Sequence, residues 1–323
     1  MNPSLPTAPR RTAVVTGASS GIGRATAIAF AEQGWSVVLA ARGAEALEEA
    51  AADCRAAGAE ALAVPTDVTD ATAVKALRDA AIERFGAVDA WVNNVGIGAV
   101  GRFETVPIED HQRVIAANLL GHMNGAHAVV PHFRERRRGV LINMVSIGGW
   151  TPTPLAASYS ASKWGLRGFS EVLRAELADL PGVHVCDVAP VLVDTPGLDH
   201  GANYSGRRLK LPPGAVAPER VAAAVVALAD RPRARTFVGT GTTPARLAHA
   251  LAPDLVALVT LRVMEWALGR SDPAPTTQGN LFEASRGTTI SSTTPMAGVH
   301  AAALSGLAAA GLGAAVWLLR RGR

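Results

Sequence analysis

Short apolar runs alternate with stretches of helical periodicity along the first 245 residues of the chain. The apolar runs predict strands at 12–16, 36–40, 61–65, 89–93, 140–145, 183–188 and 235–239. Helical patterns separate them, among others at 22–33, 44–57, 70–85 and 158–179. Strands that are apolar throughout and separated by helices are typical of a parallel sheet covered on both faces. Residues 10–245 are therefore predicted to form one α/β domain, a doubly wound parallel sheet of about seven strands.

The pattern changes after residue 245. Residues 246–270 are apolar but carry Asp254, Arg262 and Glu265, so they predict an amphipathic helical extension that lies on a surface rather than across a bilayer. Residues 271–296 are rich in Pro, Ser, Thr and Gly, a composition that predicts a linker.

Residues 297–319 contain no Asp, Glu, Lys or Arg. A helix of this length spans roughly 34 Å, enough for a hydrocarbon core of about 30 Å, and Trp317 and the arginines that follow suit an interface. The segment predicts a C-terminal membrane anchor on a cytoplasmic catalytic domain. The alternative is an Ala/Gly-rich tail that docks on the domain or frays. A single span would carry those arginines across the membrane, against the positive-inside tendency, which argues against a simple anchor.

Composition narrows the function classes. The chain has 323 residues, is 49% hydrophobic and carries a net charge of +4, and its basic residues form no stripe interleaved with aromatics, which argues against a nucleic-acid partner. The basic run at 134–139 reads as a solvated helix end or as a contact to an anionic membrane surface. The eight histidines and two cysteines show no metal-ligand spacing, and the first residues lack the apolar core of a secretory signal.

The stretch TGASSGIG, residues 16–23, lies between the first predicted strand and the first predicted helix. Gly17 can form the tight turn, and Gly21 and Gly23 let the backbone approach a ligand closely. The N–H groups of the helix start then face a pyrophosphate. In this strand–turn–helix setting the glycine pattern predicts a dinucleotide site.

The end of the second predicted strand bears on the choice of dinucleotide. A carboxylate there would bind the ribose 2′-hydroxyl and repel a 2′-phosphate. The sequence instead has Arg42, with Arg24 just after the glycine turn. This favours NADP(H) over NAD(H), while a surface role for either arginine stays open.

Tyr159 and Lys163, in the stretch YSASKWG, are four residues apart on a predicted helix and therefore share a face. Taken alone, this spacing fits an ordinary amphipathic helix as well as a catalytic pair. A nearby ammonium group favours the phenolate and is expected to lower the pKa of Tyr159. The phenol can then exchange a proton with a substrate oxygen in either direction.

Several motifs, in this order, resemble the short-chain dehydrogenase/reductase family over about residues 10 to 240: TGASSGIG, Asp67-Val68, NNVG (93–96), Asn118, Ser146, Tyr159, Lys163 and PVLVDTP (190–196). The resemblance implies a catalytic set of Asn118, Ser146, Tyr159 and Lys163. It also implies a cofactor-binding set of Gly17, Ser19, Ser20, Gly21, Ile22, Gly23, Arg42, Asp67, Val68, Asn94, Gly96, Tyr159, Lys163, Pro190 and Thr195.

The resemblance also implies roles for these residues. Asp67 would contact adenine, Lys163 the nicotinamide ribose and Thr195 the carboxamide. Ser146 would hold the substrate oxygen, and Asn118 a water that links Lys163 to solvent. The sequence departs from the family at Val191, where glycine is usual, and at Val95, where alanine is usual.

The implied function is an NADP(H)-dependent interconversion of a small-molecule carbonyl and an alcohol, in an enzyme that is usually a homo-oligomer. The resemblance implies a mobile substrate lid at 196–215. With Trp150, Val191 and Leu192 it indicates an apolar pocket suited to a lipid-like substrate. Arg207, Arg208 and Lys210 read as a solvated loop, or as partners of an acidic substrate. The alternatives are a catalytically weak NADP(H) sensor and a membrane-tethered scaffold on the same fold.

Overall fold

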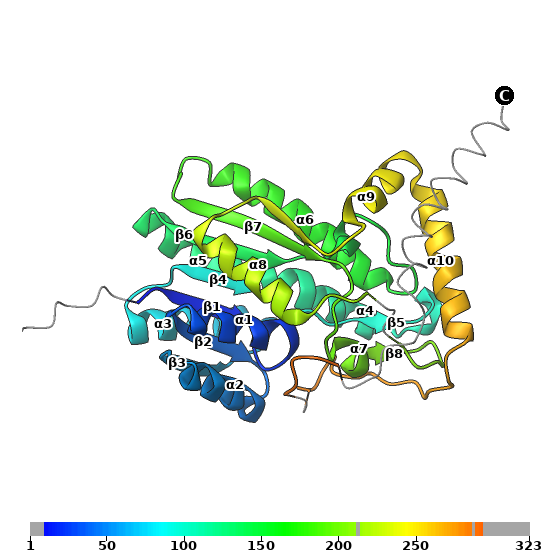
Figure 1. The fold of residues 1–323 in the computed structure, drawn as a ribbon, viewed down its shortest axis with the longest axis horizontal. Coiled ribbons are helices and arrows are strands. Elements are labelled where there is room, and N and C mark those ends of the chain that lie inside the picture. Colours follow the sequence, from blue (N-terminus) through cyan, green and yellow to red (C-terminus); the bar gives the residue numbers. More distant parts are fainter. Residues whose placement is uncertain (1–9, 211–213, 286–287, 293–323) are drawn as a thin grey trace, which may run out of the picture.

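A computed structural model gives the structure of residues 10–210, 214–285 and 288–292. Its centre is a sheet of seven parallel strands in the order β3-β2-β1-β4-β6-β7-β9 (Figure 1). The strands are β1 (Thr12–Thr16), β2 (Ser36–Ala41), β3 (Ala61–Pro65), β4 (Ala90–Asn93), β6 (Gly139–Met144), β7 (Val183–Pro190) and β9 (Arg235–Val238). Each one coincides with a predicted apolar run, so the predicted doubly wound parallel sheet is confirmed.

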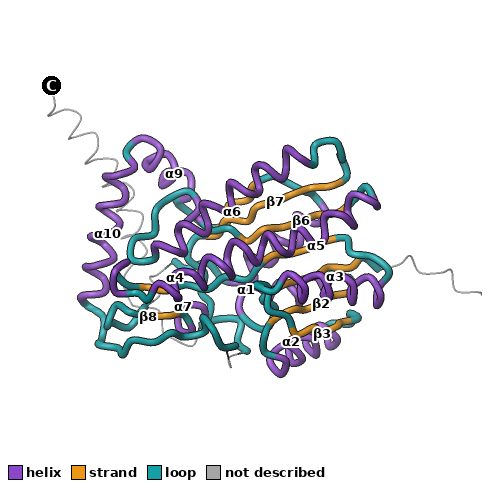
Figure 2. Tube along the Cα trace, turned by 180° about the vertical axis from the view of Figure 1, so that it is seen from behind, coloured by secondary structure: helices purple, strands orange, loops and turns teal. Residues whose placement is uncertain are grey.

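Both faces of the sheet are covered because the strands are apolar on both faces. Along β1, Val15 packs into one hydrophobic cluster and Val14 into the other. Helices α1, α2 and α8 cover the first face, seen in front in Figure 1, and α3, α5 and α6 cover the second, seen in Figure 2. Their bounds are α1 (Gly21–Glu32), α2 (Ala44–Ala56), α3 (Ala71–Phe85), α5 (Gly121–Arg136), α6 (Ala157–Glu176) and α8 (Pro218–Asp230).

The helix ends follow local rules of capping. Helix α3 begins after Asp70, whose carboxylate accepts hydrogen bonds from the backbone N–H groups of Thr72 and Ala73. It ends at Gly86, which has a φ of 79° and so takes the left-handed conformation that closes a helix. Helix α5 ends with Arg134 and Arg136, and Arg136 pairs with Asp89 at 3.0 Å. The basic run is thus a helix end, as one of its two interpretations had it.

The strand order reverses between β1 and β4. The chain runs from β1 outward to β2 and β3, then returns to β4 on the other side of β1. In an open α/β sheet the loops on either side of such a point diverge, and a crevice opens at the carboxyl ends of the strands.

Smaller elements surround this crevice. A two-stranded sheet joins β5 (Ala99–Val100) to β8 (Ala202–Asn203), next to α4 (Ile108–Ile115) and α7 (Gly197–His200). The predicted helical extension is divided into α9 (Thr242–Leu251) and α10 (Pro253–Gly269). The break falls at Ala252 because Pro253 has no N–H to continue the first helix.

Asp110 lies in the first turn of α4 and is 0% exposed. It accepts hydrogen bonds from the Tyr204 hydroxyl and from Gln278, which explains how a carboxylate is buried. The predicted membrane span at 297–319 lies outside the described residues, and within them no helix is long and apolar enough to cross a bilayer.

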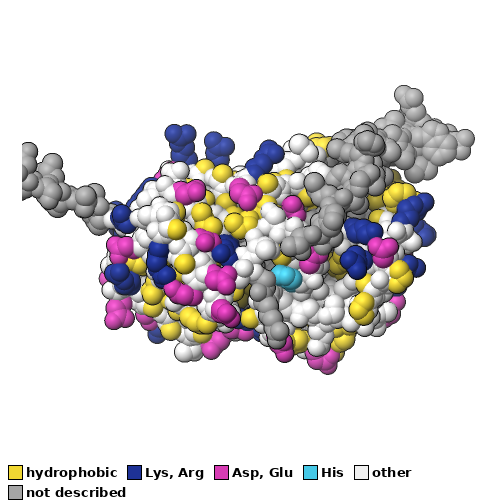
Figure 3. All heavy atoms as spheres, turned by 60° about the horizontal axis from the view of Figure 1, so that its bottom comes forward, with side chains coloured by type: hydrophobic (Ala, Val, Ile, Leu, Met, Phe, Trp, Pro, Cys, Tyr) yellow, Lys and Arg dark blue, Asp and Glu magenta, His cyan; other side chains and the backbone are white. Residues whose placement is uncertain are grey.

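The surface carries charges of both signs. On the face in Figure 3, Lys and Arg side chains are interspersed with Asp, Glu and hydrophobic side chains. Within residues 10–210, 214–285 and 288–292, no group of three or more His, Cys, Asp or Glu side chains is arranged to hold a metal ion.

Candidate active site

The glycine turn between β1 and α1 is built for close approach. Gly17 has a φ of 66° and Gly21 a φ of 54°, which side-chain-bearing residues rarely adopt. A Cβ on Gly23 would lie 2.0 Å from the carbonyl oxygen of Gly17, so only glycine fits there. Asn94 fixes the turn from β4, because its Nδ2 donates to the carbonyl oxygens of Thr16 and Gly17 at 3.1 and 3.3 Å.

A single cavity of about 1210 Å³ opens at this edge of the sheet. Of the predicted site residues, all but Asn118 line it: Gly17, Ser19, Ser20, Gly21, Ile22, Gly23, Arg42, Asp67, Val68, Asn94, Gly96, Ser146, Tyr159, Lys163, Pro190 and Thr195. Residues from six separate strand ends and the start of α1 thus meet around one space. The glycine cradle and the N-terminal end of α1 fit the pyrophosphate of a dinucleotide.

The end of the cavity near β2 and β3 is charged. Burial opposes ionisation of Asp67, but hydrogen bonds from Arg113, at 2.8 Å, and from Thr69 outweigh it and hold its pKa below the usual value. Arg42 lies beside this pair, and its pKa is lowered by burial and then by the charge of Arg113. Arg24, the other predicted phosphate partner, pairs instead with Asp53 on α2, at 2.6 Å.

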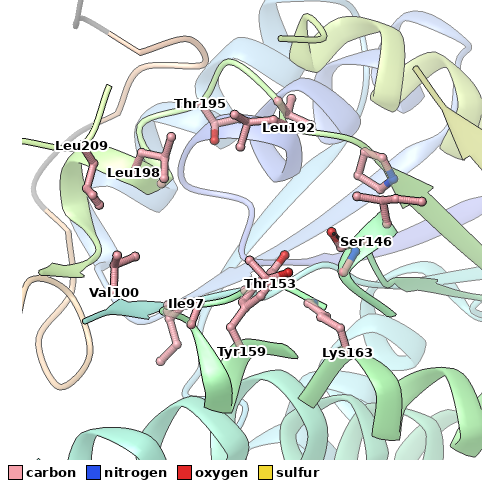
Figure 4. Close-up of a pocket in the computed structure, with 18 of the residues that line it drawn as sticks. Ile97, Val100, Ser146, Thr153, Tyr159, Lys163, Leu192, Thr195, Leu198 and Leu209 are labelled. Atoms are coloured by element: carbon pink, nitrogen blue, oxygen red, sulfur yellow. Dashed lines mark hydrogen bonds between the residues drawn. The ribbon is translucent and has the colours of Figure 1, made fainter. Parts of the chain in front are cut away.

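Helix α6 brings Tyr159 and Lys163 to the cavity on one face, as their spacing predicted (Figure 4). Lys163 Nζ lies 5.7 Å from the centre of the Tyr159 ring. Ser146, after β6, faces them and contributes a hydrogen bond to Tyr159. Its Oγ also accepts from the Gly148 N–H at 3.1 Å, which orients the hydroxyl.

The expected effect of Lys163 on Tyr159 is wrong for this structure. Burial raises the pKa of Tyr159, and the hydrogen bond from Ser146 opposes that rise only in part. Burial also lowers the pKa of Lys163 to about 7. A largely desolvated lysine is therefore a weak source of positive charge near neutral pH, and the removal of both side chains from water dominates.

Asn118 lies behind the cavity rather than on its wall. It belongs to a π-helical turn, Ala116–Leu120, between α4 and α5. Its Nδ2 donates to the Ile97 carbonyl at 2.8 Å and to Ser162 Oγ at 3.2 Å, and its Oδ1 accepts from the Ile97 N–H at 2.9 Å. These bonds fix the loop after β4 against α6. The implied link from Asn118 through water to Lys163 stays a prediction.

The predicted apolar pocket is only partly correct. Val191 and Leu192 line the cavity, but Trp150 does not. Trp150 is 6% exposed and packs edge-to-face on Phe237, with ring centroids 5.0 Å apart, beneath β7 and β9. A large aromatic ring gains more from burial in that cluster than from a wall position.

The outer wall of the cavity was not predicted from the sequence. Side chains of α9 and α10 form it, among them Ala248, Leu255, Val259, Val263 and Met264. The spacing of Leu255, Val259 and Val263, four residues apart, marks one face of a helix. This pattern could have indicated a ligand-facing stripe rather than a surface-packing helix.

The sequence matches the family model of short chain dehydrogenases over residues 11–202. It is 33% identical over 282 residues to an uncharacterized oxidoreductase, YxnA, of Bacillus subtilis, across 85% of this chain and 78% of that protein. It is 40% identical over 228 residues to 3beta-hydroxysteroid dehydrogenase 1 of Eggerthella lenta, across 68% of this chain and 87% of that protein.

Solved structures give the same result. A short chain dehydrogenase/reductase from Burkholderia phymatum in complex with NAD superposes with a TM-score of 0.65 at 28% identity, across 83% of this chain and 98% of that chain. An alcohol dehydrogenase from Thermococcus sibiricus complexed with 5-hydroxy-NADP superposes with a TM-score of 0.64 at 28% identity, across 72% of this chain and 97% of that chain. The extent of these matches shows that the chain belongs to the short-chain dehydrogenase/reductase family and is an NAD(P)-dependent oxidoreductase.

Proposed function

We propose that this protein is an NADP(H)-dependent oxidoreductase that interconverts a carbonyl and a secondary alcohol on an apolar substrate, with Tyr159 as the general acid and base. One observation carries the proposal. Tyr159, Ser146 and Lys163 face a single cavity that continues from the glycine turn to a wall of apolar side chains.

In this proposal, different residues of the chain bind different parts of the dinucleotide. The glycine turn takes the pyrophosphate, Asp67 the adenine, Lys163 the nicotinamide ribose and Thr195 the carboxamide, and the remaining cofactor-binding residues shape the walls between them. When bound, the reduced nicotinamide supplies a hydride and the oxidised form accepts one.

The charge around Arg42 supports NADP(H) over NAD(H). Arg42 donates to the main-chain carbonyl oxygens of residues 280–283, and a carbonyl oxygen carries no formal charge to neutralise a guanidinium group. The nearby carboxylate of Asp67 is already paired with Arg113. An uncompensated guanidinium group beside a second one attracts a phosphate dianion, and Arg presents donors that match phosphate oxygens.

The source of the proton follows from the protonation state of Tyr159. Because burial raises its pKa, the phenol is protonated near neutral pH and can donate to a carbonyl oxygen. In the reduction direction the carbonyl carbon gains the hydride, the oxygen gains the Tyr159 proton, and the phenolate left behind is reprotonated from solvent. Ser146 stabilises the charge that develops on the substrate oxygen. The oxidation runs through the same groups in reverse.

The substrate end of the cavity supports an apolar molecule. Ile97, Val100, Leu198 and Leu209 gather at the end away from Lys163 (Figure 4). The apolar faces of α9 and α10 extend the same wall. Such a lining binds a bulky hydrocarbon body and leaves one polar atom for Tyr159 and Ser146. A relative named as a 3beta-hydroxysteroid dehydrogenase makes steroid-like ketones the first class to test.

The test is oxidation of NADPH and of NADH by the full chain with a steroid ketone, a long-chain ketone and a small polar ketone. We expect turnover with NADPH and the apolar ketones, and a loss of roughly 10²- to 10⁴-fold in Tyr159→Phe with NADPH binding retained. Turnover that survives in Tyr159→Phe contradicts the role of that residue. Equal rates with NADH contradict the coenzyme preference, and turnover confined to the small polar ketone contradicts the substrate class.

The proposals on oligomeric state and cellular location are based on the sequence alone. We propose a homo-oligomer, because the family resemblance implies one. A cytoplasmic catalytic domain with an anchor at 297–319 is the proposal for its location, and the segment that would carry the anchor lies outside the described residues.

A further inference from the structure

The described residues that follow α10 fold back over the crevice instead of leading away from the domain. We call residues 277–285 and 288–292 the strap. In Figure 1 the segment after α10 runs beneath α7 and β8 toward α2. Thr277 begins this return by exchanging two backbone hydrogen bonds with Asn203, at 2.8 and 3.0 Å. The predicted linker thus contains no helix or strand in its described part, yet it is packed against the domain.

Carbonyl oxygens of the strap accept hydrogen bonds from the Arg42 guanidinium group. The guanidinium Nη1 donates to the carbonyl oxygens of Leu281 and Phe282 at 3.1 and 3.0 Å. Its Nη2 donates to those of Asn280 and Glu283 at 2.6 and 2.7 Å. Four oxygen atoms of the strap therefore surround the group proposed to read the 2′-phosphate.

The strap also reaches the glycine turn. The backbone N–H of Gly21, the first residue of α1, donates to the carbonyl oxygen of Thr289 at 3.0 Å. Arg24 Nη1 donates to the carbonyl oxygen of Thr288 at 2.6 Å. The partial negative charge of a peptide oxygen sits at the helix start, where a pyrophosphate oxygen would be favoured. At both ends of the crevice, strap oxygens occupy donors that a dinucleotide needs.

We propose that the strap is an intramolecular ligand of the coenzyme site, which NAD(P)(H) must displace from Gly21 and Arg42 in order to bind. The inference rests on the proposed function, since it takes this crevice as the coenzyme site. Binding then requires the open state of the strap, and the apparent Kd of either coenzyme equals its intrinsic Kd divided by the fraction of molecules in which the strap is open.

The strap is held from outside the cavity as well. Leu281 is 0% exposed and packs in a cluster with Ala99, Val106, Val114 and Ala202. Gln278 Nε2 donates to the buried Asp110 at 3.2 Å. The side chain of Leu281 does not line the cavity. Its truncation therefore weakens the strap without removing a group that faces the coenzyme.

The experiment measures the Kd of NADPH and of NADH for the full chain and for Leu281→Ala, by quenching of intrinsic fluorescence. We expect Leu281→Ala to bind both coenzymes about 3- to 10-fold more tightly, by the same factor for each. Leu77→Ala is the matched control, because Leu77 is equally buried but lies on α3 in another cluster. It should leave both constants unchanged.

Arg42→Met separates the two roles of that residue. Loss of the strap anchor should tighten NADH binding, while loss of the phosphate partner should weaken NADPH binding. If NADH binding stays unchanged and NADPH binding alone weakens, Arg42 reads the phosphate without holding the strap, and the inference fails.

Hydrogen exchange on the unmodified chain tests the inference without any variant. NADPH should increase amide exchange in the strap, with the largest effect at residues 280–285. Protection of the strap by NADPH, or weaker binding by Leu281→Ala, would show that the strap completes the site instead of competing for it. If neither the full chain nor Leu281→Ala binds a coenzyme, the proposed function fails first; tighter binding by Leu281→Ala alone would support both.

Discussion

Lys163 Nζ donates a hydrogen bond to the carbonyl oxygen of Met144 at 2.8 Å. This bond ties the middle of α6 to the last residue of β6, and with it the side chain that the proposed function assigns to the nicotinamide ribose. Lys163 is 2% exposed, so its ammonium group is almost completely removed from water. The carbonyl replaces only one of the hydrogen bonds that water would give. The lowered pKa of Lys163 follows from this deficit.

The buried lysine makes stability depend on pH. The pKa of Lys163 falls from 10.5 to about 7 in the folded chain, so between these values the unfolded chain binds more protons at this residue. Stability therefore rises with pH across that window, and the gain is absent below it. Urea unfolding of the wild type and of Lys163→Met should show that the free energy of unfolding of the wild type, relative to the variant, rises by about 3 kcal/mol from about pH 7 to about pH 9.5.

Met is the matched replacement because it keeps an unbranched chain without the charge. All other titrating groups are common to both proteins, so the difference between them isolates Lys163. A difference that stays flat with pH would mean that Lys163 titrates at its ordinary value and that the carbonyl of Met144 compensates for its burial.

The proposed function assigns the Ser146 hydroxyl to the substrate oxygen. Ser146→Ala removes the group proposed to stabilise the substrate oxygen, so kcat should fall by roughly 10²-fold with a small change in KM. The hydrogen bond from Ser146 also lowers the pKa of Tyr159. Without this hydrogen bond the pKa of Tyr159 should be higher, so Tyr159 stays protonated to a higher pH. The alkaline limb of the pH–rate profile for carbonyl reduction should therefore move to higher pH.

Ser160→Ala is the control for that experiment. Ser160 follows Tyr159 on α6, and its hydroxyl accepts a hydrogen bond from the Thr153 N–H at 3.3 Å, as that of Ser146 does from the Gly148 N–H. It does not line the cavity. A similar loss of kcat in Ser160→Ala would assign the effect to loop geometry and not to the substrate oxygen.

The sheet and the glycine turn could be predicted because their signals are local. Apolar runs of strand length and the glycines at 17, 21 and 23 fix where the chain bends and what it can approach. The shared face of Tyr159 and Lys163 followed from helical spacing alone. In each case the residues that make the feature are near neighbours in the sequence.

The strap and the buried Asp110 could not be predicted in this way. Arg42 contacts residues 280–283, which are far from it in the sequence. The segment that contains them is rich in Pro, Ser, Thr and Gly and has no hydrophobic periodicity to indicate where it packs. A lone carboxylate is usually exposed, and the partners that allow the burial of Asp110, Tyr204 and Gln278, are distant from it in sequence. The π-helical turn around Asn118 has no local signature in the sequence either.

The glycine cradle gives a stringent test of the dinucleotide site. Gly23→Ala would bring Cβ to 2.0 Å from the Gly17 carbonyl oxygen and 2.6 Å from Asn94 Nδ2, so the turn must open. Titration should show at least a roughly 100-fold weaker binding of either coenzyme, a loss of about 3 kcal/mol. Gly168→Ala on α6 has open space around it and should raise stability by up to about 1 kcal/mol without affecting coenzyme binding. Unchanged coenzyme binding by Gly23→Ala would place the dinucleotide elsewhere.

The departure at Val191 is matched by a glycine on the neighbouring strand end. A Cβ on Gly239 would lie 2.3 Å from Val191 Cγ2, and Gly239 has a φ of 116°. The side chain of Val191 therefore packs into the space that the missing Cβ of Gly239 leaves open. Gly239→Ala should destabilise the protein by about 1–3 kcal/mol through overpacking, with backbone strain in addition.

Val191→Ala removes the clashing methyl group and should recover the steric part of that loss. In the double-mutant cycle the two substitutions should couple by about 0.5–3 kcal/mol, measured from denaturant unfolding. Additive effects would mean that strain at the φ of Gly239, with the contact of the new Cβ to Val216 Cγ2 at 3.1 Å, accounts for the loss and that Val191 contributes nothing to it. Coupling would instead show that this chain accommodates valine by a compensating glycine, which leaves the cavity wall around Pro190 and Thr195 in place.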